Sequence, residues 1–191
     1  PKGLYALALA NTGERFGYYT MLAIFVLFLQ ANFGFSAATA GNIYGGFLAL
    51  VYFLPVLGGI LADKFGFGRM VTLGIVVMFI GYLLMALPLG TNTVALIAMF
   101  TALVLISLGT GLFKGNLQVM VGDLYNDPRY SDKRDVAFSL FYMAINIGAM
   151  FAPMVTVWLC EVALNANGLV YDGAIPSICN KLLANEALTP E

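Results

Sequence analysis

The sequence predicts an all-α polytopic membrane protein, and three observations lead to this fold class. Of its 191 residues, 61% are hydrophobic and only 10% are charged, whereas a soluble domain carries about 25% charged residues. Residues 16–62, 70–113 and 136–160 contain no Asp, Glu, Lys or Arg. Because a membrane-spanning helix needs roughly 20 mostly apolar residues, the first two stretches each hold two spans and a turn. A β-barrel would instead show strands that alternate in polarity over about ten residues.

Five spans follow one another along the chain, separated by residues that end helices. We predict them at about 4–31, 37–62, 70–90, 94–125 and 136–162. The breaks read ANFGFS, DKFGFGR, PLGTNT and NDPRYSDKRD, and each contains Gly, Pro, Asn, Asp or Ser, the residues that make turns. The first span is too long for a cleaved signal peptide. The expected organisation is a transmembrane bundle over residues 1–163 and an extracytoplasmic segment over residues 164–191.

The positive charges between the spans predict the orientation of the bundle. One side carries six of them: Lys2, Lys64, Arg69, Arg129, Lys133 and Arg134. The other side carries only Lys181. Since Lys and Arg gather on the cytoplasmic side of membrane proteins, the N-terminus and the 63–69 and 126–135 connections are expected there. The protein would be a multi-pass protein of the plasma membrane or the bacterial inner membrane.

Several classes of function are excluded by what the sequence lacks. The formal net charge is −1 and no basic run occurs, so nucleic acid is not an expected partner. There is no His, no CxxC, no clustered set of metal ligands and no phosphate-binding loop, so we expect no metal and no cofactor. Cys160 and Cys179 fall near or beyond the outer face. An oxidising compartment would allow a disulfide between them, but two unpaired cysteines are the simpler interpretation.

Polar residues of four separate spans lie at a similar depth. Counted from the cytoplasmic ends of the spans at 1.5 Å per residue, Arg15, Tyr52, Lys114 and Asn146 are all roughly 15–17 Å deep. This is close to the middle of a hydrocarbon core about 30 Å thick. Ionisable residues inside a membrane are functional candidates by default, so we expect these four side chains to line one shared cavity.

The first span carries a wide polar face of its own. Asn11, Glu14 and Tyr18 follow at helical spacing, and Arg15 and Tyr19 form the neighbouring stripe. Glu14 and Arg15 are adjacent, so they project about 100° apart on a helix, and each is expected to find its partner on another helix. A purely structural ion pair is the alternative interpretation. Tyr5, Tyr44 and Tyr82 are interpreted as ordinary membrane-protein aromatics.

Four segments together resemble one family of transporters. NTGERFGYYT (11–20) resembles the first-span motif Glu-x-x-Glu-Arg-Phe-x-Tyr-Tyr of the proton-coupled oligopeptide transporters, which belong to the major facilitator superfamily. FYMAINIGAMFAP (141–153) and GTGLFKGNLQVMVGDLY (109–125) are similar to the fifth-span and fourth-span segments of that family. GGILADKFGFGR (58–69) resembles the loop motif of the wider superfamily.

The resemblance implies a major facilitator fold of two six-helix bundles, of which this chain holds five spans of the first. It also implies proton-coupled symport of di- and tripeptides by alternating access, with protons as the coupling ion and no enzymatic activity. The implied substrate-binding residues are Arg15, Tyr18, Tyr19, Tyr52, Lys114 and Asn146. Glu14 and Lys114 would serve proton coupling or charge balance, and Asp63 and Arg69 would belong to a gating loop. Peptides, protons, the lipid bilayer and the C-terminal bundle of the same protein are the implied partners.

The chain also departs from the family pattern at three positions. The family's first glutamate is Asn11 here, a frequent arginine is Leu22, and Gly115 stands where a proline usually follows the lysine. These changes keep two other functions open. The same fold could transport another anionic solute, such as nitrate or a carboxylate drug, or the protein could be a membrane scaffold or sensor that transports nothing.

Overall fold

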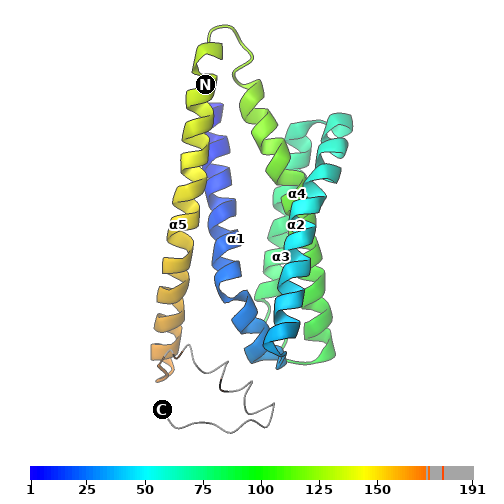
Figure 1. The fold of residues 1–191 in the computed structure, drawn as a ribbon, viewed down its shortest axis with the longest axis vertical. Coiled ribbons are helices and arrows are strands. Elements are labelled where there is room, and N and C mark those ends of the chain that lie inside the picture. Colours follow the sequence, from blue (N-terminus) through cyan, green and yellow to red (C-terminus); the bar gives the residue numbers. More distant parts are fainter. Residues whose placement is uncertain (171, 173–177, 179–191) are drawn as a thin grey trace.

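The computed structural model describes residues 1–170, 172 and 178 of the chain, and these form a bundle of long helices (Figure 1). The helices are α1 (Gly3–Phe33), α2 (Ala37–Phe65), α3 (Phe67–Ala86), α4 (Thr93–Asp123) and α5 (Arg134–Ala166). A short 3₁₀ helix, η1 (Ser131–Lys133), precedes α5. All five α-helices are long and apolar enough to cross a membrane. They overlap the five predicted spans, but which part of each helix lies in the bilayer stays a prediction.

The predicted turn residues end the helices through specific backbone contacts. Gly34 follows α1 in the left-handed conformation, and its N–H donates to the carbonyl of Gln30. The side chain of Ser36 accepts a hydrogen bond from the backbone of Thr39 at the start of α2. Asn92 caps α4 in the same way.

The 63–69 connection is shorter than the sequence predicts. α2 continues to Phe65 and α3 begins at Phe67, so only Gly66 lies outside a helix. Gly66 has φ = 92°, a conformation that residues with a Cβ avoid, and it lets the chain reverse within one residue. The prediction of a gating loop holding Asp63 and Arg69 is therefore wrong in its local structure. Asp63 lies in the last turn of α2 and Arg69 in the first turn of α3, and both side chains are exposed.

The helices associate as two groups. α2 and α3 both pack along α4, whereas α1 packs along α5. Figure 1 shows α1 and α5 side by side, with α2, α3 and α4 on the other side of α1. The N-terminus, the α2–α3 connection and the α4–α5 connection lie at one end of the bundle. The arrangement thus brings the six cations counted above to the same end, although the side of the membrane that this end faces stays a prediction.

Glycines allow the closest contacts between helices. A Cβ on Gly74 would lie 2.7 Å from the carbonyl oxygen of Gly109, so α3 and α4 touch through backbone atoms. A Cβ on Gly148 would lie 2.6 Å from the carbonyl oxygen of Thr12, so α5 and α1 do the same. Small residues are enriched at helix contacts in membranes because they let backbones approach.

Polar side chains add hydrogen bonds between the packed helices, among them those of Asn116 and Thr12. The Asn116 amide on α4 donates to the carbonyl of Gly58 on α2 at 3.1 Å and to Leu112 at 2.7 Å. The Thr12 hydroxyl on α1 contacts the carbonyl of Ala144 on α5 at 3.0 Å. Such contacts between membrane helices contribute about 0.6 kcal/mol each on average.

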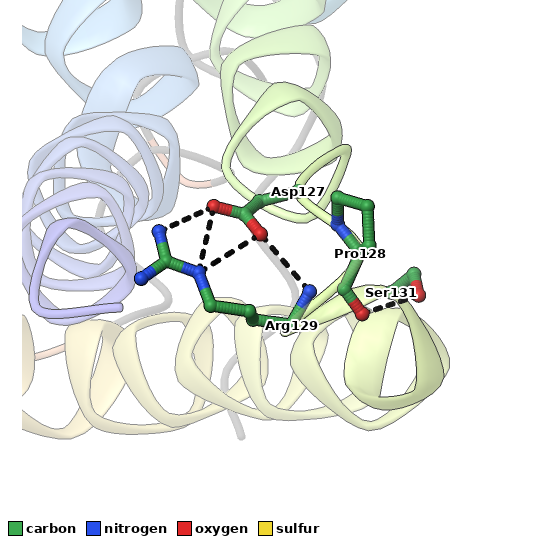
Figure 2. Close-up of polar contacts among 4 residues, drawn as sticks. All are labelled: Asp127, Pro128, Arg129 and Ser131. Atoms are coloured by element: carbon green, nitrogen blue, oxygen red, sulfur yellow. Dashed lines mark hydrogen bonds and ion pairs between the residues drawn. The ribbon is translucent and has the colours of Figure 1, made fainter.

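The turn between α4 and α5 is organised by an ion pair (Figure 2). Arg129 donates to the Asp127 carboxylate from its backbone N–H at 2.9 Å and from its guanidinium at 2.7 Å. The Ser131 hydroxyl donates to the carbonyl of Pro128. These hydrogen bonds from Arg129 hold the pKa of the exposed Asp127 carboxyl below its usual range. The turn therefore has a defined geometry.

The extracytoplasmic segment predicted for residues 164–191 falls mostly outside the described residues. Cys179 and Lys181 also lie outside them, so the expectation of two unpaired cysteines and the outer position of Lys181 stay predictions. Cys160, which is described, has a free thiol on α5.

Candidate functional site

Glu14 and Arg15 form a buried ion pair on α1. Arg15 Nε lies 2.9 Å from Glu14 Oε2, and the two side chains are only 7% and 4% exposed, respectively. The prediction that each would pair with another helix is wrong. Their Cβ atoms do diverge, but the long arginine side chain folds back to the carboxylate. Leaving a buried charge unpaired is strongly unfavourable, and this contact avoids it. The N–H of Arg15 is not directed at either carboxylate oxygen, so the contact is electrostatic and leaves both oxygens without a hydrogen bond.

Tyr18 extends this charged pair toward α2. The guanidinium of Arg15 lies 5.7 Å from the centre of the Tyr18 ring, within the range of a cation–π interaction. The same ring packs edge-on against Tyr19 at 5.5 Å and contacts Phe47 of α2 at 6.3 Å. Tyr18 is buried, whereas Tyr19 is exposed. Arg15 is therefore fixed between a carboxylate and an aromatic face.

Lys114 and Tyr52 form a second pair, between α4 and α2. The ammonium of Lys114 lies 4.6 Å from the centre of the Tyr52 ring. Lys114 is half-buried, whereas the Tyr52 side chain is 68% exposed. The sequence predicted both residues for the site, and the structure brings them into contact.

The two pairs lie within electrostatic range of each other. Lys114 interacts with both Arg15 and Glu14 across the space between α4 and α1. With all three groups ionised, one negative and two positive charges leave an excess of one positive charge. This arrangement favours a ligand that brings an anionic group.

Two predicted site residues are not part of this cluster. Asn146 on α5 is exposed and makes no hydrogen bond to any residue that the structure describes. Ala144 and Gly148 both contact Thr12 of α1. Asn146 lies two residues from each of them, about half a helical turn away, and so is on a different face of α5. Asp63 and Arg69 form no ion pair with each other within the described chain. The structure thus places residues of three of the four spans in contact or within electrostatic range, whereas the shared cavity itself stays a prediction.

Tyr82 on α3, interpreted from the sequence as an ordinary membrane-protein aromatic, is a further candidate for the site. Its hydroxyl is buried without a hydrogen-bond partner, and it interacts electrostatically with Glu14. In the sequence Tyr82 is one aromatic residue in an apolar helix, and no local pattern indicates that this helix faces α1 at the depth of Glu14. No group of three or more metal-ligating side chains occurs in the described part of the chain.

The fold is a bundle of helices long enough to span a membrane, with a charged cluster between them, and comparison with known proteins identifies its family. The sequence profile of the POT family (PTR2) matches residues 68–166. The chain belongs to the POT family.

Curated relatives extend the similarity over the whole chain. The dipeptide and tripeptide permease A of Klebsiella pneumoniae (strain 342) is 34% identical over 201 residues, covering 100% of this chain and 38% of the relative. The uncharacterized transporter YclF of Bacillus subtilis (strain 168) is 40% identical over 163 residues, covering 81% of this chain and 31% of the relative. The chain therefore spans about a third of the length of these relatives.

Solved structures share the fold. A crystal structure of tetrameric PepTSo2 matches with a TM-score of 0.77 and 35% identity, covering 93% of this chain and 37% of the other. The peptide transporter POT in complex with sulfate matches with a TM-score of 0.76 and 36% identity, covering 94% of this chain and 35% of the other. The predicted all-α polytopic fold of the major facilitator type is confirmed.

Proposed function

We propose that this chain is the N-terminal part of a transporter that moves di- and tripeptides across a membrane together with protons. The observation that carries the proposal is the cluster formed by the buried Glu14–Arg15 pair of α1 and Lys114 of α4, which lies within electrostatic range of that pair. The named function of the permease relatives supports peptide as the substrate. Alternating access would require the C-terminal bundle that the family resemblance implies.

The chemistry of the cluster suits a peptide zwitterion. Arg15 and Lys114 would donate to the peptide carboxylate, and Glu14 would accept from its ammonium group or balance the two cations. Tyr18, Tyr19 and Tyr52 provide apolar ring faces with polar ends for the peptide side chains. Asn146 carries both donors and acceptors for a peptide bond, and would join the site from α5 once substrate is bound.

Proton coupling and orientation belong to the same proposal. Since Glu14 lies beside two cations, a change in its protonation would change the charge that the substrate meets. The six cations at one end of the bundle favour a cytoplasmic N-terminus in a plasma membrane or bacterial inner membrane. Asp63 and Arg69, exposed near the ends of α2 and α3 at that face, are proposed to take part in gating.

The direct test is transport by the full-length protein in proteoliposomes. An inward proton gradient is expected to drive accumulation of labelled dialanine, and unlabelled trialanine is expected to compete for it. Accumulation of labelled nitrate under the same gradient, without uptake of dialanine, would support the alternative anionic substrate instead. Uptake of neither solute would favour a scaffold or sensor.

A further inference from the structure

Three buried side-chain atoms lack a hydrogen-bond partner among the residues that the structure describes. Two are the carboxylate oxygens of Glu14, and the third is the hydroxyl oxygen of Tyr82. Buried polar atoms are nearly always hydrogen-bonded in native proteins, so each exception requires an explanation. That these atoms come from two residues within electrostatic range of each other suggests one explanation for all three.

The chemistry of the two groups is complementary. An ionised carboxylate only accepts hydrogen bonds, and a phenol is a good donor. Glu14 already has cations beside it on α1 and α4, namely Arg15 and Lys114. Neither cation provides a hydrogen bond to it. The buried Tyr82 hydroxyl therefore lacks an acceptor, and the Glu14 carboxylate, with which it interacts electrostatically, lacks a donor.

A cavity lies between the helices that carry the two groups. Tyr82 lines a cavity of about 310 Å³ together with Gly17 and Thr20 of α1. Gly17 follows Glu14 by three residues, so the two lie on the same face of the helix. A Cβ placed on Gly17, or on Gly13 one turn earlier, would meet no atom within 4 Å. No neighbouring side chain therefore occupies the space beside these two glycines on either side of Glu14.

We propose that Tyr82 is a positioning residue for Glu14, whose hydroxyl donates a hydrogen bond to the Glu14 carboxylate during the transport cycle. A small change of side-chain rotamer would make this bond, and no proton is transferred in making it. The bond would hold the ionised carboxylate toward α3 and away from Lys114. When Glu14 takes up a proton, the bond weakens and the carboxyl group can turn. The role of Tyr82 in transport rests on the proposed function. The hydrogen bond between Tyr82 and Glu14 does not depend on it.

Infrared spectroscopy tests the hydrogen bond without any assumption about transport. The carboxyl band of Glu14 in the full-length protein is the one that disappears in Glu14→Gln. Removing the donor in Tyr82→Phe disfavours the ionised form, so the pH midpoint of this band is expected to rise by about one unit. Tyr44→Phe is the matched control, since Tyr44 is a partly buried tyrosine of α2. An unchanged midpoint in Tyr82→Phe would overturn the proposal.

Transport of labelled dialanine then tests the consequence of the bond. Tyr82→Phe is expected to move the pH dependence of uptake toward higher pH, and Tyr44→Phe is expected to leave it in place. In a Glu14→Gln background, Tyr82→Phe should cause no further shift, because its partner is already gone. The same shift in both backgrounds would show that Tyr82 serves another group and would overturn the inference. If the wild-type protein takes up no peptide, the proposed function fails while the infrared result still decides the hydrogen bond.

Discussion

The ammonium group of Lys114 lies 4.6 Å from the centre of the Tyr52 ring. This contact joins α4 to α2 at the edge of the charged cluster, and it fixes the position of the cation that is proposed to receive the peptide carboxylate. The contact depends on the face of an aromatic ring and not on the tyrosine hydroxyl. Substitutions of Tyr52 can therefore separate the effect of its ring face from the effect of its hydroxyl.

Replacing Tyr52 with leucine is expected to weaken dialanine affinity roughly two- to fivefold, since a cation–π contact at an exposed site contributes about 0.5–1 kcal/mol. Tyr52→Phe keeps the ring and should retain most of the affinity. The apparent KM for uptake is the measurement. Equal losses in the two variants would show that the hydroxyl, and not the ring face, is what matters.

The contact between Gly148 and Thr12 predicts a position where added volume is not tolerated. Gly148→Ala would place a Cβ 2.6 Å from the Thr12 carbonyl oxygen, and we expect this crowding to lower stability by about 1–3 kcal/mol. Gly45→Ala on α2 is the control, because a Cβ there meets no atom within 4 Å. The melting temperature in detergent should fall only for Gly148→Ala. A similar Tm for both variants would contradict the close packing of α1 on α5.

The Asp127–Arg129 turn is expected to respond to acid. Because Arg129 lowers the pKa of the Asp127 carboxyl, its contribution is fully present above the unfolded pKa of about 3.9. It is lost as pH falls through the lower folded value. The amide protection factor at Arg129 should therefore decrease in acid and should already be low at neutral pH in Asp127→Asn. Equal protection in the variant and the wild type at neutral pH would show that the carboxylate does not organise the turn.

Replacing Asn11 with glutamate is expected to change the pH dependence of peptide uptake without changing the affinity for peptide. Asn11 is buried on the same face of α1 as Glu14, and Asn11→Glu would place two carboxylates one turn apart. Like charges at this distance resist simultaneous ionisation. We expect the variant to keep its dialanine affinity within about twofold and to change the pH profile of uptake. Asn11→Gln is the neutral control, and overlapping profiles for Asn11→Glu and the parent would exclude a coupling role for this position.

The asymmetry of Lys and Arg predicts how the bundle is oriented. A membrane-impermeant thiol reagent applied to intact cells should label Asn167→Cys, at the end of α5, in a background where Cys160 and Cys179 are serine. Ser131→Cys, in η1, should be labelled only after the membrane is permeabilised. Labelling of Ser131→Cys in intact cells would reverse the topology.

The sequence was sufficient for the helices because uncharged stretches and turn residues are local signals. It located Arg15, Tyr52 and Lys114 in one layer because helix rise converts sequence position into depth. It failed at Glu14 and Arg15, since side-chain flexibility let adjacent residues meet despite their divergent Cβ directions. The loop predicted to hold Asp63 and Arg69 was wrong, because Gly66, with its positive φ, is the only residue between α2 and α3. Sequence reasoning also missed Tyr82, whose significance depends on α3 facing α1.

The central claim is that Lys114 and the Glu14–Arg15 pair act together as half of a peptide site. The most direct measurement is proton-driven uptake of labelled dialanine by the full-length protein carrying Lys114→Ala. Lys64→Ala is the control, because Lys64 is an exposed lysine at the end of α2. We predict that Lys114→Ala loses uptake by more than about tenfold while remaining folded, and that Lys64→Ala stays near wild type. Wild-type uptake by Lys114→Ala would contradict the account and leave the buried charges with a structural role alone.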